Sequence, residues 1–158
     1  MGDRLQRMRL PALPTVLFAD ASVDYRAMAR DALVEGRDAT DLRVATDGAD
    51  LLAYLHRTGR WATALAPRPA LIVLDAALPG EPPGLDAIRQ IKQDPELKRI
   101  PVLALGADDD PATVERAYDA GANTYFVKPV TFLALVKLVK VFTEYWLQTA
   151  ELPAEETA

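Results

Sequence analysis

The stretch ALIVLDAALP at residues 70–79 places five consecutive apolar residues directly before Asp75. An apolar run of this length is typical of a strand that is buried on both faces. Such a strand belongs to a parallel sheet that is covered by helices on either side. Asp75 therefore stands where a buried strand leaves the core and enters a loop that contains Pro79.

Outward from this strand, four more short apolar runs alternate with segments of helical spacing. The runs are residues 15–19, 42–45, 101–105 and 124–127, and the helical segments are 23–35, 48–58, 85–93, 111–120 and 131–147. Five strands that alternate with five helices predict an α/β fold, a flavodoxin-like doubly wound parallel sheet with strand order 2-1-3-4-5. In the first helical segment, the spacing predicts that Met28, Leu33 and Val34 point toward the core.

The composition excludes several kinds of site. The chain has no cysteine, one histidine and a net charge of −5. These counts exclude a disulfide framework, a thiolate zinc site and a histidine-cluster metal site. The acidic balance argues against a nucleic-acid partner, which would need a basic surface. No apolar run approaches the roughly 18 residues of a membrane span, and no signal-peptide core follows Met1. We therefore expect a cytoplasmic protein with neither a nucleic-acid nor a membrane partner.

The length of 158 residues suits a single domain with short ends. Residues 1–14 mix arginines with Pro11 and Pro14 and have no sustained apolar period, so we expect an N-terminal extension. Residues 15–147 carry the alternating pattern of the domain. Residues 148–158 are acidic and small, which predicts a C-terminal tail.

Four residues follow the ends of predicted strands: Asp20, Asp75, Gly106 and Lys128. The carboxyl ends of neighbouring parallel strands meet at one edge of the sheet, where such folds bind ligands. Two carboxylates there suit Mg²⁺, and a carboxylate can also act as a nucleophile toward a phosphoryl group. Each residue alone has an ordinary structural explanation, as a helix lead-in, a turn residue or a surface lysine. Their combination at matching strand ends favours a metal and phosphoryl site.

Three segments resemble the receiver domain of two-component response regulators: LIVLDAALP at 71–79, IPVLAL at 100–105 and GANTYFVKP at 121–129. They occur in the order of that CheY-like family, and the resemblance extends from about Thr15 to Leu147. It implies the same flavodoxin-like fold that the alternating pattern predicts.

Further segments resemble one branch of this family, the single-domain regulators that partner phytochrome-type sensor kinases. They are VDYR at 23–26, DPELKRIP at 94–101 and YWL at 145–147. The resemblance implies that the kinase partner is a sensor histidine kinase of this type, such as a bacteriophytochrome.

The resemblance also implies a role for each residue of the predicted site. Asp75 would accept a phosphoryl group from a kinase histidine, and Lys128 would contact the phosphoryl oxygens. Asp20, Asp75 and the backbone carbonyl of Ala77 would hold Mg²⁺. Tyr125 matches the aromatic residue that turns inward on activation. The chain would be a signalling protein with at most slow self-dephosphorylation, because Ala77 supplies no second acid for an independent hydrolase.

Two positions depart from the family pattern. Ala19 replaces the acid that usually precedes Asp20, so we expect weak Mg²⁺ binding. Gly106 replaces the usual Thr or Ser, whose hydrogen bond to a charged acceptor is worth about 1.5–3 kcal/mol. The backbone N–H of Ala107 remains as a donor at that place.

These residues leave two functions open. In the first, the chain is a single-domain response regulator that is phosphorylated on Asp75 and signals by protein–protein contact. In the second, it is a degenerate pseudo-receiver that binds proteins independently of phosphorylation. Asp75, Asp20 and Lys128 favour the first function, whereas Ala19 and Gly106 favour the second. Only about 30 residues follow Lys128, so we expect output by protein contact and not through a separate domain.

The last helical segment is apolar on more than one side. One stripe, spaced to face the sheet, contains Phe132, Leu135, Val139, Phe142 and Trp146. A second stripe includes Leu138, Val141 and Tyr145, which either the tail or a partner must cover. Receiver domains commonly dimerise in this region. The resemblance therefore implies a homodimer, formed by the last helix alone or by the face that it shares with the fourth helix and the fifth strand.

Overall fold

The computed structural model describes residues 13–154. The expected N-terminal extension, residues 1–14, lies almost entirely outside the described residues. The end of the predicted tail, residues 155–158, lies outside them as well. Within residues 13–154, no helix is long and apolar enough to cross a lipid bilayer.

The described part of the chain forms one parallel sheet in the order β2-β1-β3-β4-β5, which confirms the predicted fold. The five strands are β1 (Thr15–Ala19), β2 (Asp41–Ala45), β3 (Leu71–Asp75), β4 (Val102–Gly106) and β5 (Thr124–Val127). All neighbouring strands pair in parallel. This order makes β1 and β3 direct neighbours, so the residues that follow them open onto the same crevice.

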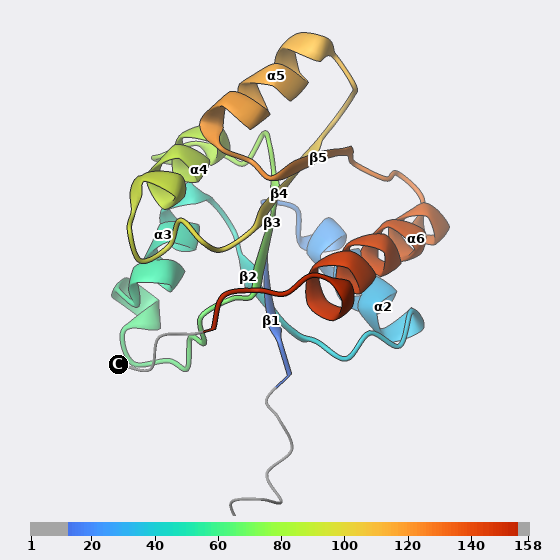
Figure 1. Ribbon diagram of the computed structural model, residues 1–158, viewed down its shortest axis with the longest axis horizontal. Helices are drawn as coiled ribbons and strands as arrows, with labels where there is room; N and C mark the ends of the chain where they lie inside the picture. The colour runs from blue at the N-terminus through green and yellow to red at the C-terminus, as the bar shows by residue number, and fades with distance from the viewer. Residues whose placement is uncertain (1–12, 155–158) are drawn as a thin grey trace, which may run out of the picture.

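Within residues 13–154, five α-helices cover the two faces of the sheet, as the alternating pattern predicts. They are α2 (Val23–Glu35), α3 (Gly48–His56), α4 (Gly84–Gln93), α5 (Pro111–Ala120) and α6 (Phe132–Thr143). In Figure 1, α3, α4 and α5 lie on one side of the sheet and α2 and α6 lie on the other. After α6 the chain continues in a π-type turn over Glu144–Thr149, which ends two residues beyond the predicted domain boundary at residue 147.

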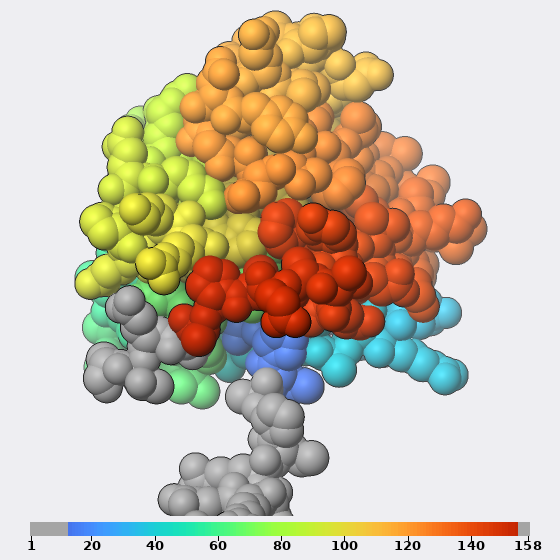
Figure 2. All heavy atoms as spheres, in the orientation of Figure 1, coloured from blue at the N-terminus to red at the C-terminus, as the bar shows by residue number. Residues whose placement is uncertain are grey.

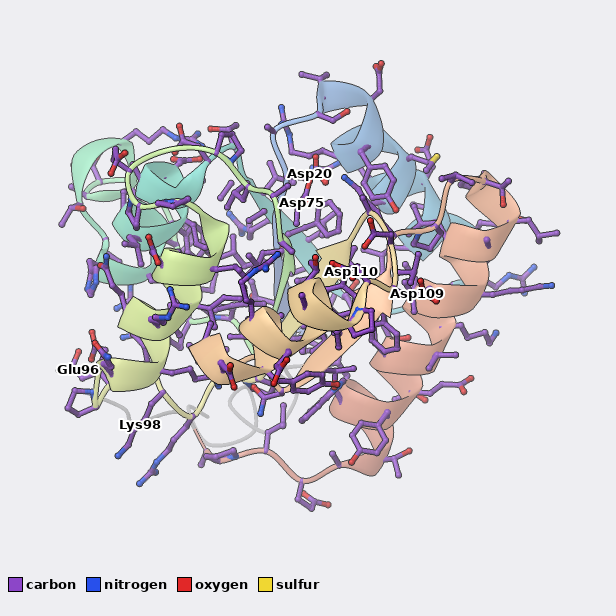
Figure 3. All side chains as sticks on the ribbon, turned by 90° about the horizontal axis from the view of Figure 1, so that it is seen from above. Asp20, Asp75, Glu96, Lys98, Asp109 and Asp110 are labelled. Carbon is purple, nitrogen blue, oxygen red and sulfur yellow. The ribbon has the colours of Figure 1, made fainter. Side chains whose placement is uncertain are left out.

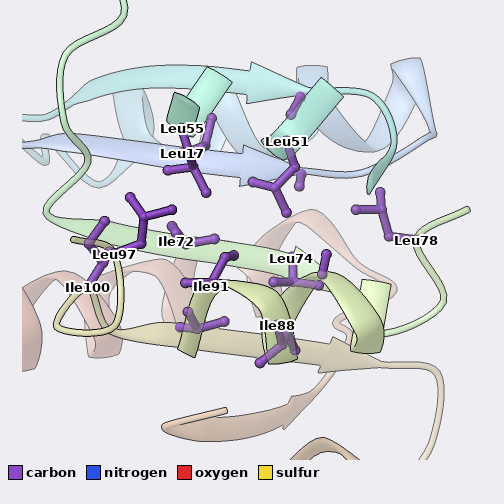
Figure 4. Close-up of a cluster of buried hydrophobic side chains, with 14 of the residues drawn as sticks. Leu17, Leu51, Leu55, Ile72, Leu74, Leu78, Ile88, Ile91, Leu97 and Ile100 are labelled. Carbon is purple, nitrogen blue, oxygen red and sulfur yellow. The ribbon is translucent and has the colours of Figure 1, made fainter. Parts of the chain in front are cut away.

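The apolar run of β3 fills both halves of the core. Ile72 and Leu74 join the cluster between the sheet and α3, α4 and α5, which we call the first core cluster (Figure 4). Leu71 and Val73 join the cluster between the sheet and α2 and α6, the second core cluster. Successive side chains of a strand point to opposite faces, so a strand that is covered on both sides must be apolar throughout. This burial fixes β3 and therefore the position of Asp75.

Several helix ends have the expected capping residues. The Ser22 side chain accepts a hydrogen bond from the Tyr25 N–H at the start of α2, and the Asp47 side chain accepts one from the Asp50 N–H at the start of α3. Gly121 ends α5 with a φ of 111°, a left-handed conformation that suits glycine. Asp110 and Pro111 stand at the start of α5, but the Asp110 side chain makes no capping hydrogen bond to the helix backbone.

The predicted inward position of Val34 is wrong, because this side chain is 73% exposed. Helix α2 buries Ala29, Ala32 and Leu33 against the second core cluster. Each residue of an α-helix is turned by about 100° from the one before it, so Val34 lies to the side of this buried stripe. Leu33 is buried as expected, and Met28 is partly buried.

Asp50 in α3 carries a pH-dependent part of the stability. Its carboxylate accepts hydrogen bonds from Arg60 Nε (2.8 Å), Arg60 Nη2 (2.6 Å) and Trp61 Nε1 (2.9 Å). Burial opposes ionisation, but these bonds and one from the Thr46 N–H lower the pKa of Asp50 from 3.8 to about 2. Because the folded pKa lies below the unfolded one, the stabilisation is complete above about pH 5 and is lost as the pH falls toward 2.

We expect the Asp50→Asn variant to lose about 2 kcal/mol of unfolding free energy at pH 7. The wild type should lose stability between pH 5 and pH 3 more steeply than the variant does. Urea unfolding at several pH values measures both effects. An equal pH dependence in the two proteins would contradict this assignment.

Candidate functional site

The two predicted aspartates meet at the carboxyl edge of the sheet. Asp20 follows β1 directly, and Asp75 is the last residue of β3. The pairing of Ala19 with Leu74 aligns the two strand ends. Figure 3, seen from above, places Asp20 and Asp75 side by side, with Asp109 and Asp110 apart from them. Asp109 and Asp110 therefore lie outside this pair.

Lys128, directly after β5, bridges the two carboxylates. Its Nζ lies 2.7 Å from Asp20 Oδ2 and 3.1 Å from Asp75 Oδ2. The exposed fractions of the side chains are 2% for Asp20, 19% for Asp75 and 21% for Lys128. Partial burial disfavours the ammonium ion, but hydrogen bonds with both carboxylates raise the pKa of Lys128 overall. The structure thus brings together the three charged residues that the sequence predicts, and their net charge is one negative unit.

Backbone groups of the loops hold the other two carboxylate oxygens. Asp20 Oδ1 accepts a hydrogen bond from the Ser22 N–H (2.8 Å), and Asp75 Oδ1 accepts one from the Ala77 N–H (2.9 Å). Arg26 Nη1 donates to the Asp20 carbonyl oxygen (2.7 Å). Each carboxylate is therefore fixed on one side by its own loop and on the other side by Lys128.

The donor set fits a magnesium ion that has few protein ligands. Mg²⁺ commonly binds one or two carboxylates and completes its coordination with waters and phosphate oxygens. Asp20 and Asp75 supply two carboxylates, and Ala77 lies two residues after Asp75 in the loop between β3 and α4. Among residues 13–154, no cluster of three or more His, Cys, Asp or Glu side chains is present. Ala19 is fully buried in the first core cluster and offers no ligand.

Tyr25 is a site residue that the sequence-based reasoning missed. The Lys128 Nζ lies 4.1 Å from the centre of the Tyr25 ring, and the Tyr25 hydroxyl donates to the Pro129 carbonyl oxygen (2.9 Å). The Phe18 ring stacks with the Tyr25 ring, with ring centres 6.1 Å apart. Burial, together with the negative charges of Asp20 and Asp75, raises the pKa of Tyr25 to about 12. Tyr25 thus contacts both Lys128 and Pro129. The sequence feature that could have indicated this role is the position of Tyr25 in the first turn of the helix that follows Asp20.

Gly106 and Tyr125 lie against each other. The sequence analysis treats them separately, Gly106 as a departure from the family pattern and Tyr125 as the matching aromatic residue. Gly106 is buried at the end of β4. A Cβ atom added to it would overlap the hydroxyl oxygen and Cζ of Tyr125 and would lie 2.7 Å from Cε2. The Tyr125 hydroxyl donates to the Asp108 carbonyl oxygen (2.6 Å). The phenol therefore points inward, over the end of β4.

The three candidate interface residues of the last helix differ in exposure. Val141 and Tyr145 are each 56% exposed, whereas Leu138 is half-buried and packs against the second core cluster. Of the stripe predicted to face the sheet, Phe142 is buried but Phe132, in the first turn of α6, is exposed. The exposed large apolar residues of α6 are therefore Phe132, Leu133 and Val141, which match the predicted second stripe only in part.

A parallel sheet in this order, with two aspartates and a lysine at its carboxyl edge, has the arrangement of a receiver domain. The family model for the response regulator receiver domain matches residues 16–140. The chain belongs to this family, whose members in two-component systems are signalling proteins.

Relatives from photosensory systems are similar over nearly the whole chain. Response regulator Rcp1 of Synechocystis sp. is 33% identical over 144 residues, which are 91% of this chain and 95% of Rcp1. A response regulator in red light signaling of R. palustris has a TM-score of 0.82 at 30% identity, covering 90% of this chain and 99% of that one. The phosphorylated cyanobacterial phytochrome response regulator RcpA has a TM-score of 0.81 at 32% identity, covering 90% of this chain and 100% of that one. Rcp1 has also been solved in a Mn²⁺-bound form, with a TM-score of 0.78. The chain is thus related to phytochrome response regulators.

We expect the contacts of Tyr25 to be separable by substitution. Tyr25→Phe loses only the hydrogen bond to Pro129, at a cost of about 1 kcal/mol of unfolding free energy. Tyr25→Leu also loses the ring face on Lys128 and should cost about 1 kcal/mol more. Urea unfolding measures both values.

The matched control for this prediction is the same pair of substitutions in a Lys128→Met background. Without the ammonium group, the part of the difference between the Phe and Leu variants that comes from the charge should disappear. A difference of the same size in both backgrounds would show that Tyr25 contributes packing only.

Proposed function

We propose that this chain accepts a phosphoryl group on Asp75 from a sensor histidine kinase and signals by protein–protein contact. The observation that carries this proposal is the Lys128 ammonium group, which bridges Asp20 and Asp75 at the edge of the sheet. A structural lysine would need only one carboxylate, whereas phosphoryl transfer needs a nucleophile and a positive charge within reach of the same oxygens. The relation to phytochrome response regulators supports a phytochrome-type kinase as the partner.

In the proposed transfer, one Asp75 carboxylate oxygen attacks the phosphorus of a phosphohistidine. The new P–O bond forms as the P–N bond breaks, and the bonding electron pair stays on the imidazole nitrogen. This nitrogen takes a proton from solvent, which leaves the kinase histidine as neutral imidazole. No oxidant or reductant takes part. The Ala77 N–H holds one oxygen of Asp75 and leaves the other on the side of Lys128.

Lys128 would keep its contact with Asp20 and exchange its Asp75 partner for a phosphoryl oxygen. The ammonium group then neutralises charge that develops on the equatorial oxygens. Gly106 adds no hydroxyl there, so the remaining protein donor that we propose is the backbone N–H of Ala107. We expect both groups to bind the phosphoryl group as well as to assist its transfer.

We propose that Asp20, Asp75 and the Ala77 carbonyl hold Mg²⁺ weakly. When bound, the ion would offset the negative charge of the carboxylates and of the incoming phosphoryl oxygens. The weakness follows from Ala19, which leaves the site one carboxylate short of the family pattern.

We also propose that residues 15–147 act as the receiver domain, residues 1–14 as an extension and residues 148–158 as a tail. The phosphoryl transfer from the kinase would take place in the cytoplasm. The chain itself would remove the phosphoryl group slowly at most.

Incubation with acetyl phosphate and Mg²⁺ tests the acceptor. We expect the intact mass to rise by one phosphoryl group in the wild type and in Asp109→Asn, a control in an exposed acidic loop, but not in Asp75→Asn. The absence of a mass change in the wild type at millimolar Mg²⁺ would contradict the proposal. It would instead favour the phosphorylation-independent binding module.

We propose that a second copy of the chain covers the exposed side of α6. Val141 and Tyr145 are exposed there, with Lys137 and Lys140 beside them. On α5, the exposed Glu115 lies one turn before Tyr118, whose hydroxyl accepts a hydrogen bond from the β5 backbone. The atoms of α5, β5 and α6 form one continuous face in Figure 2. A two-fold related copy can therefore place the lysines of α6 against the acids of the partner's α5.

We expect the wild type to be a dimer at micromolar concentration in size-exclusion chromatography with light scattering. Replacing Val141 and Tyr145 together by Glu should give a folded monomer, because two charges would then lie in the apolar contact. Val34→Glu is the matched control, since this exposed valine lies on α2, away from the α5–β5–α6 face. A monomeric wild type would overturn the proposed dimer.

A further inference from the structure

The end of β4 contains a volume that two different side chains could fill. Gly106 is buried and its strand pairs with β5 so that Ala104 lies opposite Tyr125 and Gly106 opposite Val127. A side chain on residue 106 would start in the volume that the Tyr125 phenol occupies. Because the two cannot be present together, the residue at 106 decides where the phenol lies.

The inward phenol is held through its ring and through its hydroxyl. Its ring packs against the first core cluster, and its hydroxyl donates to the Asp108 carbonyl oxygen at 2.6 Å. The backbone N–H of Tyr125 donates to the Tyr118 hydroxyl of α5 (3.3 Å). Burial and the negative charges of Asp108, Asp109 and Asp110 raise the pKa of Tyr125, so the hydroxyl stays protonated and remains a donor. Tyr125 thereby connects β5 to the loop between β4 and α5.

None of these contacts requires a phosphoryl group. The Asp108 carbonyl belongs to the backbone, and the first core cluster is present in the unmodified protein. The phenol has room beside residue 106 because that residue is glycine. A serine or threonine at 106 would push the phenol out of this volume, because its Cβ atom alone would overlap the phenol hydroxyl. With glycine at 106, the phenol can stay in this volume whether or not a phosphoryl group is present.

We propose that Tyr125 is a positioning residue that holds the β4–α5 loop in one arrangement, both before and after Asp75 is modified. The face of α5, β5 and α6 would then present the same Tyr125 conformation in both states. A partner that reads this residue would bind without phosphorylation. The part of the inference that concerns the modified state rests on the proposed phosphorylation of Asp75, whereas the part that concerns the unmodified state does not.

Nuclear magnetic resonance of ring-labelled tyrosine tests the inference directly. The chain has five tyrosines, and the Tyr125→Phe variant identifies the signal of Tyr125. Spectra are recorded with and without beryllofluoride and Mg²⁺, in the wild type and in Gly106→Thr. A separate fluorine signal reports whether beryllofluoride has bound.

In the wild type, we expect the Tyr125 signal to keep its position when beryllofluoride binds. In Gly106→Thr, the signal should lie at a different, solvent-exposed position both with and without beryllofluoride, because the threonine Cβ atom occupies the volume in either state. A wild-type signal that moves on binding, or an unmodified Gly106→Thr protein with the wild-type signal, would overturn the inference. If no beryllofluoride binds to the wild type, the proposed phosphorylation of Asp75 is contradicted. The spectra of the unmodified wild type and unmodified Gly106→Thr would still show whether residue 106 determines the position of the Tyr125 ring.

The smaller Gly106→Ala substitution covers the case in which Gly106→Thr does not fold. One Cβ atom is enough to displace the phenol, so Gly106→Ala should lower the urea midpoint of the wild type. The same change should have little effect in a Tyr125→Ala background, where the volume is open. Equal shifts in the two backgrounds would contradict the shared volume of residues 106 and 125.

Discussion

The ammonium group of Lys128 lies between two carboxylates that would otherwise repel each other, and the carboxyl edge of the sheet depends on this contact. The three residues are distant in sequence, since Lys128 follows Asp20 by 108 positions and Asp75 by 53. At an effective dielectric constant of about 20, unit charges about 4 Å apart interact by about 4 kcal/mol. The positive charge of Lys128 therefore offsets a substantial repulsion between the two carboxylates. Lys128 is fixed in turn by its own N–H, which donates to the Gly106 carbonyl oxygen at 2.7 Å. The strand order brings these three residues together, and their contacts in turn hold the ends of β1, β3 and β5 at this edge.

Two tyrosines contact the groups at the carboxyl edge of the sheet. Tyr25 places its ring against Lys128, and its hydroxyl donates to the Pro129 carbonyl oxygen. At Gly106, where a hydroxyl is missing, the phenol of Tyr125 fills the space and bonds the Asp108 carbonyl. Both tyrosines act on neighbouring groups of the site. Compared with the family pattern, the site thus retains Asp20, Asp75 and Lys128 but lacks one acid and one hydroxyl.

The sequence predicts those features that follow from regular periods and strand ends. The apolar run before Asp75 predicts a strand with two covered faces, and the positions of Asp20 and Lys128 after their strands place them at the same edge. Features that depend on the volume of individual side chains were not predictable in this way. Val34 was assigned to the core because the helical period alone does not identify which of two adjacent apolar residues faces the sheet. The contact of Tyr25 with Lys128, and that of Tyr125 with Gly106, joins residues whose proximity only the folded chain establishes.

The role of the Lys128 bridge is tested most directly by a crystal structure of the protein with beryllofluoride and Mg²⁺. We expect beryllofluoride on an Asp75 carboxylate oxygen, with the Lys128 Nζ moved from Asp75 to a fluorine atom and still bonded to Asp20. A structure in which Asp75 stays unmodified at saturating beryllofluoride, or in which Lys128 turns to solvent while beryllofluoride is bound, would contradict a phosphoacceptor site organised by this lysine.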